Sequence, residues 1–72
     1  MIKFWVYESR KDFAWLFKGE GDLDKVARKI DMVSREACCF EPEEPLDREL
    51  VEKLIRAVRS EKSKLLLAKM LA

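Results

Sequence analysis

Four residue types are missing from this sequence of 72 residues: histidine, asparagine, glutamine and threonine. Without histidine the chain lacks the side chain that most often acts as a general acid or base near neutral pH, and also the commonest metal ligand. Without side-chain amides it lacks the groups that bind adenine through paired hydrogen bonds in the major groove. The only two glycines, Gly19 and Gly21, do not form a phosphate-binding loop. We therefore expect no enzymatic activity, no cofactor and no small-molecule substrate.

Charged residues make up 40% of the sequence and apolar residues 49%. The apolar fraction is too high for a disordered polar segment, and the length is near the lower limit for a chain that folds alone. We therefore predict one domain covering residues 1–72. The sequence is rich in Glu, Lys and Arg and lacks the heat-labile residues Asn and Gln. This composition is typical of hyperthermophile proteins, so we expect a thermophilic source.

This composition leads to a prediction about thermal stability. We expect a cooperative unfolding transition above about 80 °C, because heat-labile amides are absent and charged side chains are dense. Circular dichroism during heating in ordinary buffer would measure the transition. A midpoint near about 50 °C, which is typical of mesophile domains, would contradict the prediction of a thermophilic source.

The sequence carries no sign of a membrane or secretory segment. No apolar run approaches the roughly 18 residues of a membrane-spanning helix. The N-terminus alternates aromatic and charged residues, without the basic segment and cleavage site of a signal peptide. We expect a soluble, cytoplasmic protein with no membrane partner.

The N-terminal segment predicts a β-hairpin. Six of the seven aromatic residues lie within the first 17 positions. Segments 2–8 and 13–18 are aromatic and β-branched with polar residues between them, which indicates two strands joined by a turn. A four-residue loop at 9–12 would pair Glu8 with Phe13. One hairpin face, the better candidate for the core, would carry Ile2, Phe4, Val6, Phe13, Trp15 and Phe17. The other would carry Lys3, Trp5, Tyr7, Ala14, Leu16 and Lys18.

A first helix is predicted over about 22–39. Apolar residues from Leu23 to Ala37 repeat at helical spacing, and Asp22 is placed to cap the N-terminus. Gly19 and Gly21, just before it, are expected to end the hairpin.

A second helix is predicted after an acidic connector at 41–49, which holds both prolines and has one base against five acids. Asp47 would cap this helix. Polar residues at 60–64 interrupt its apolar stripe, so either one long helix continues through them, which we favour, or Ser60 caps a separate short helix. The predicted fold class is α+β: an N-terminal β-hairpin followed by two helices (ββαα) that pack on one sheet face.

The second face of the hairpin is the most informative candidate for a contact surface. Helices on one side would leave Trp5, Tyr7 and Leu16 exposed on the other, which is a large apolar cluster for a monomer of this size. A second copy of the chain that covers this face, or that pairs with a free strand edge, would complete the structure. Leu66 and Met70, in the leucine-rich tail, offer a further surface for the same contact.

Nucleic acid is the alternative partner. Residues 50–72 hold six bases against two acids, and Lys53, Arg56 and Arg59 follow one another at a three-residue spacing. Lys3 and Lys18 could attract phosphate while the neighbouring aromatic rings stack on unpaired bases. Interspersed glutamates make the basic segment more typical of a solvated helix surface with ion pairs than of a groove-reading helix.

Cys38 and Cys39 are the only cysteines and are adjacent. With no histidine and no second pair of cysteines, one chain cannot assemble a conventional zinc site, so we expect no bound metal. We favour two small buried side chains, with an intersubunit disulfide as the next alternative. A bond between the two neighbours would close a strained ring that is easily reduced, which gives these residues a candidate redox role.

These observations favour a non-enzymatic protein that acts by association, as a homodimer or as a subunit of a larger complex. The alternative is a small nucleic-acid-binding regulator that uses the basic C-terminal helix or the aromatic hairpin face.

Overall fold

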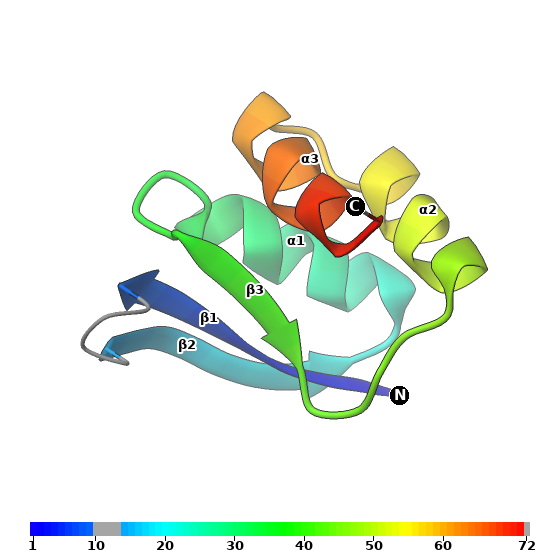
Figure 1. The fold of residues 1–72 in the computed structure, drawn as a ribbon, viewed down its shortest axis with the longest axis horizontal. Coiled ribbons are helices and arrows are strands. Elements are labelled where there is room, and N and C mark those ends of the chain that lie inside the picture. The colour runs from blue at the N-terminus through cyan, green and yellow to red at the C-terminus, as the bar shows by residue number, and fades with distance from the viewer. Residues whose placement is uncertain (10–13, 72) are drawn as a thin grey trace.

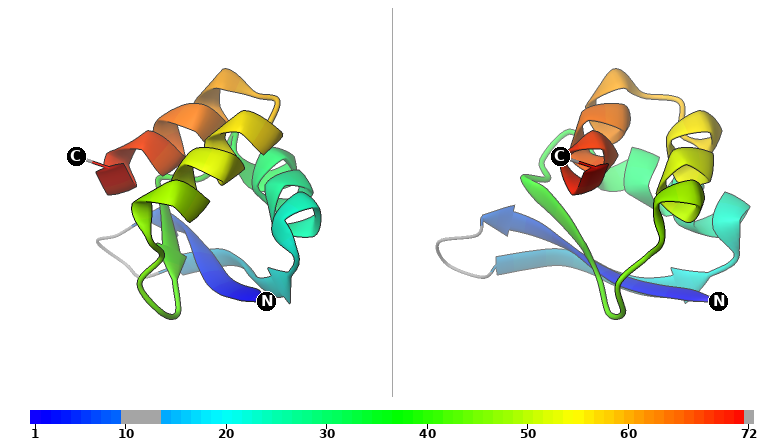
Figure 2. Two further views of the ribbon diagram at one scale, coloured as in Figure 1. Left: turned by 90° about the vertical axis from the view of Figure 1, so that its right-hand side faces the viewer. Right: turned by 45° about the vertical axis from the view of Figure 1, so that its right-hand side comes forward.

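The computed structural model describes residues 1–9 and 14–71, and for residues 9 and 14–17 it describes the backbone alone. The elements are β1 (Ile2–Ser9), β2 (Ala14–Gly21), α1 (Leu23–Val33), β3 (Cys39–Pro42), α2 (Arg48–Ala57), α3 (Glu61–Ala68) and the short 3-10 helix η1 (Lys69–Leu71). Figure 1 shows the helices on one side of the sheet, and in Figure 2 no described element covers the other side. The α+β class and the one-sided helix layer are therefore confirmed, whereas the order is ββαβαα instead of ββαα.

The main correction is a third strand. β3 pairs antiparallel with β1, which gives the sheet order β2-β1-β3. The sequence predicts a helix end and a connector here, because a four-residue strand ending in Pro42 carries almost no periodic signal. Tertiary contacts hold the strand: Phe40 is buried, and its ring centroid lies 5.3 Å from that of Phe4.

The register between β1 and β2 also differs from the prediction. Phe4 lies opposite Gly19, whereas the pairing of Glu8 with Phe13 would have placed Phe17 there. The shift is two residues from Ile2 to Val6, and the described side chains there stay on their predicted faces. After Val6 the register is irregular, so that Tyr7 lies opposite Trp15, whereas the prediction placed it opposite Ala14. β2 also continues through Gly19 and Gly21, which were expected to end the hairpin. The predicted loop at 9–12 lies largely outside the described residues, although Ser9 belongs to β1.

The first helix is shorter than the predicted range of 22–39. Asp22 caps α1 as expected, accepting a hydrogen bond from the Lys25 backbone N–H at 2.9 Å. The helix ends at Val33, and the chain then turns toward the sheet, where the Cys38 N–H donates to the Tyr7 carbonyl at 2.8 Å. The sheet thus provides the hydrogen bonds that a longer helix would have made.

The C-terminal region forms two helices instead of the favoured long one. Asp47 caps α2, accepting from the Leu50 N–H at 2.7 Å, as predicted. The chain is extended at Val58, and Ser60 caps α3 by accepting from the Ser63 N–H at 3.0 Å. The alternative in which Ser60 begins a separate helix is confirmed.

The hydrophobic core lies between the sheet and the helix layer. β1 supplies its side chains from one face only, which confirms that face as the core side for the residues whose side chains are described. The buried apolar residues of this cluster are Ile2, Phe4, Val6, Val26, Ala27, Ile30, Ala37, Phe40, Leu54, Val58, Leu66 and Leu67.

Candidate interaction surface

The sheet face without a described helix, here termed the open face, carries the aromatic residues that the sequence singled out. Phe4 and Val6 point into the core, so Lys3, Trp5 and Tyr7 alternate onto the opposite side. Trp5 and Tyr7 are half-buried and Lys3 is exposed. Trp5 and Tyr7 therefore share one face, as predicted, whereas the Leu16 side chain lies outside the described residues.

Strand pairing organises the open face into two rows, one across all three strands and one that ends on the residue after β3. Trp5 lies opposite Lys18 on β2 and opposite Glu41 on β3. Lys3 lies opposite Glu20 on β2, and its carbonyl accepts from the Glu43 N–H at 2.8 Å on the other side. The first row is thus Glu41, Trp5 and Lys18, and the second is Glu43, Lys3 and Glu20. In the second row the charges alternate in sign, and in the first row Trp5 separates an acidic residue from a basic one.

Lys18 is engaged within its own row. Its Nζ atom lies 5.2 Å from the centroid of the Trp5 ring. A cation at this position is attracted to the electron-rich ring face and contributes about 0.5–1 kcal/mol at an exposed site. The lysine therefore shields part of the ring that a nucleic-acid base would need for stacking.

The structure does not bring the candidate nucleic-acid contacts together. Lys3 and Lys18 are on the open face, whereas Arg56 belongs to α2 and Arg59 to the turn after it, in the helix layer on the other side of the sheet. Lys53 is also on α2, where its Nζ atom lies 3.6 Å from Glu49. The basic residues thus form two separate groups, and acidic residues lie close to both.

The C-terminal residues proposed as a further contact are only partly accessible. Leu66 is 4% exposed and belongs to the core, and Met70 is half-buried against it. The exposed apolar residue in this region is Leu65, at 65%. An apolar groove runs beside it, lined by Ala37, Cys38, Lys62, Leu65, Leu66, Ala68 and Lys69.

Cys38 and Cys39 are joined to each other by a disulfide with an S–S distance of 2.07 Å. The favoured expectation of two buried, unbonded side chains is therefore wrong: both residues are half-buried and bonded. Cys39 lies opposite Tyr7 at the start of β3, and the Cys38 carbonyl accepts from Lys69 Nζ at 3.4 Å.

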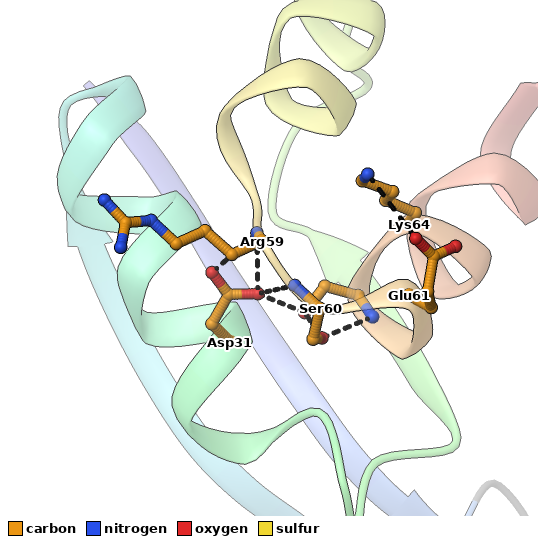
Figure 3. Close-up of polar contacts among 6 residues, drawn as sticks. Asp31, Arg59, Ser60, Glu61 and Lys64 are labelled. Carbon is orange, nitrogen blue, oxygen red and sulfur yellow. Dashed lines mark hydrogen bonds and ion pairs between the residues drawn. The ribbon is translucent and has the colours of Figure 1, made fainter.

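Asp31 is the polar residue that sequence reasoning missed. Its carboxylate, at the C-terminal end of α1, accepts from the backbone N–H groups of Arg59 and Ser60 at 3.0 Å and 3.1 Å. It also accepts from the Ser63 hydroxyl at 2.6 Å. Figure 3 shows Asp31 reaching into the turn between α2 and α3, whereas Glu61 and Lys64 pair with each other on α3, away from the Asp31 carboxylate. No local pattern marks this residue, because its partners are about 30 positions away.

The contacts of Asp31 change its acidity. Burial acts to raise its pKa, but the hydrogen bonds from Ser63, Arg59 and Ser60 outweigh burial and hold the pKa below the ordinary value of 3.8. A serine hydroxyl network surrounds the carboxylate, with Ser60 Oγ 2.7 Å from Ser63 Oγ and 3.1 Å from Ser34 Oγ. We interpret this cluster as a structural clamp between α1 and the α2–α3 turn, because every donor is already used within the fold.

Neither a metal site nor a membrane span is found in the described part of the chain. These residues contain no cluster of three or more among His, Cys, Asp and Glu that could hold a metal ion. Across the same residues, no helix has the length and apolar character needed to cross a membrane. Comparison with protein-family models, curated proteins and solved structures gave no match.

Proposed function

We propose that this protein is non-enzymatic and acts by self-association, as a homodimer or as one subunit of a larger assembly, with the open face among its contact surfaces. The observation that carries the proposal is the position of Trp5 and Tyr7 side by side along β1, on the sheet face that no described helix covers. Aromatic side chains are the usual anchors of protein interfaces. A domain of this size also gains little stability from one core, so a second contact is favourable.

The charged residues around the aromatic pair suit a protein partner. Each row of the open face contains both signs of charge, which favours complementary contacts with another patterned surface and disfavours a polyanion. A second copy of the chain presents such a surface. Cytoplasmic location and a thermophilic source remain parts of this proposal that rest on composition alone.

Sedimentation equilibrium of the native chain and of a variant with Trp5→Ser and Tyr7→Ser tests the proposal. We expect the native chain to associate at micromolar concentrations and the variant to bind at least tenfold more weakly, because both anchoring rings are removed. Met32→Ser, at a residue that is 73% exposed on α1, is the matched control and should leave association unchanged. A native chain that is still monomeric at about 0.1 mM, a concentration at which even a weak specific dimer would form, would refute the proposal.

Nucleic-acid binding is the second candidate, supported by the exposed basic residues of α2. Mobility-shift assays with single-stranded and duplex nucleic acid at two salt concentrations would detect it. Binding that weakens steeply with salt would support this candidate, and loss of that binding in the variant with Trp5→Ser and Tyr7→Ser would assign the open face to nucleic acid.

A further inference from the structure

The two edges of the sheet differ in their capacity to accept another strand. The order β2-β1-β3 leaves the outer edge of each lateral strand without a strand partner among the described residues. β3 has four residues and ends in Pro42, which has no N–H to donate, so its edge is short and blunted. β2 has eight residues and no proline, and its pairing with β1 is regular over residues 17–21. The longer edge is therefore the better template for strand addition.

The charges on β2 complement a second copy of the same strand. Lys18 and Glu20 are both exposed and lie on the open face, with Gly19 between them. If two β2 strands pair antiparallel about a twofold axis through Gly19, Lys18 lies opposite the partner's Glu20 and Glu20 lies opposite the partner's Lys18. Opposite charges that face each other directly across two strands stabilise the pairing.

The neighbouring registers are less favourable. A twofold axis perpendicular to the sheet keeps the helices of both copies on the same side of the doubled sheet. The other registers that preserve this arrangement are those in which each side chain stays on its own face, and the nearest two have the axis one residue away from Gly19. Centring the axis on Lys18 would place two lysines opposite each other, and centring it on Glu20 would place two glutamates opposite each other. Like charges directly opposite are destabilising. Charge therefore selects the register centred on Gly19 from these three.

This register also extends the rows of the open face. The row Glu43, Lys3 and Glu20 of one copy would continue into Lys18, Trp5 and Glu41 of the partner subunit, and the reverse row would form by symmetry. The charges then alternate in sign across both copies, interrupted only by the tryptophan. The doubled sheet would have six strands and one continuous open face.

We propose that two copies of the chain join through the outer edges of β2, in the antiparallel register centred on Gly19, with reciprocal Lys18–Glu20 pairs. This inference rests on the proposed function, since it names the partner and one contact of the self-association. It uses a different surface from the open-face contact, so one assembly can contain both.

The register is tested by reversing the charge of Lys18 and of Glu20 in two separate variants, and then by mixing the two variants. Lys18→Glu alone and Glu20→Lys alone should each weaken self-association about tenfold, because each turns two attractive cross-strand pairs into repulsive ones. An equimolar mixture of the two variants should regain at least the native affinity, since every pair between unlike copies is then attractive. Lys53→Glu, on α2, is the matched control. Circular dichroism confirms that each variant is folded, and sedimentation in low salt and in 0.5 M salt measures the affinities (salt at this level shortens the screening length to about 4 Å).

The outcomes separate the two proposals. Restored association in the mixture supports the Gly19 register, because a folding defect in either variant would not be repaired by mixing. An effect of only one of the two reversals, or a mixture as weak as its components, overturns the register. The register is also overturned if neither charge reversal weakens association but substitution of Trp5 and Tyr7 abolishes it. That result would still support the proposed function. A native chain that stays monomeric refutes both.

Discussion

Replacing Phe40 with alanine is expected to lower the free energy of unfolding by about 3–5 kcal/mol, the usual cost of truncating a buried phenylalanine. Phe40 is 6% exposed, lies opposite Val6 in the sheet and contacts the ring of Phe4. It is the residue through which β3 contributes to the core. The substitution leaves a cavity beside Phe4, in the core between the sheet and the helices.

Urea denaturation followed by circular dichroism measures this effect. Leu65→Ala is the matched control, because that leucine is 65% exposed and its truncation should change the free energy of unfolding by less than about 0.5 kcal/mol. Equal effects of the two substitutions would contradict the placement of β3 in the sheet and return residues 39–42 to a surface connector.

Replacing Asp31 with asparagine is expected to lower the free energy of unfolding by about 2 kcal/mol, the scale of hydrogen bonds to a charged group. The carboxylate accepts from two backbone N–H groups and one hydroxyl. An asparagine keeps the shape but offers one acceptor oxygen, and its NH₂ group faces donors. Asp24→Asn, in the exposed first turn of α1, is the matched control and should cost no more than about 0.5 kcal/mol.

The effect of Asp31 should depend on pH in a defined direction. Its pKa in the folded protein is lower than the ordinary value of 3.8, so the unfolded chain binds a proton more readily. Its contribution to stability is therefore complete above that ordinary value and is lost as the pH falls through it toward the lower folded pKa. The difference in stability between the native protein and Asp31→Asn should shrink over this interval. A difference that stays constant down to pH 2 (about two units below the ordinary Asp pKa) would show that the carboxylate charge is not what stabilises the turn.

Local rules explain the parts of the fold that the sequence predicted. Asp22 and Asp47 could be assigned as helix caps because an N-cap acts only on the next three residues. The faces of β1 could be assigned because side chains alternate strictly along a strand. The same alternation places Trp5 and Tyr7 on one face of β1, whichever residues of β2 lie opposite them.

Long-range contacts explain the parts that the sequence did not predict. The residues of β3 have weak strand character, and they pair only because β1 has a free edge and Phe40 can reach the core. The break between α2 and α3 depends on Asp31, which lies 29 positions before Ser60 and satisfies its N–H group. Ser60 could be named as a possible helix cap from the sequence, but no local pattern marked Asp31 as its partner, so sequence left the long helix and the broken one as alternatives.

The sequence alone determined the α+β class, the caps of two helices and the aromatic face of the hairpin, because each depends on neighbours within a few residues. Only the tertiary structure decided the third strand, the bond between Cys38 and Cys39 and the arrangement of the open face into rows. It also separated Lys3 and Lys18 from the basic residues of α2, since the sheet stands between them. These features depend on which distant segments come together, and that is set by burial of the whole core.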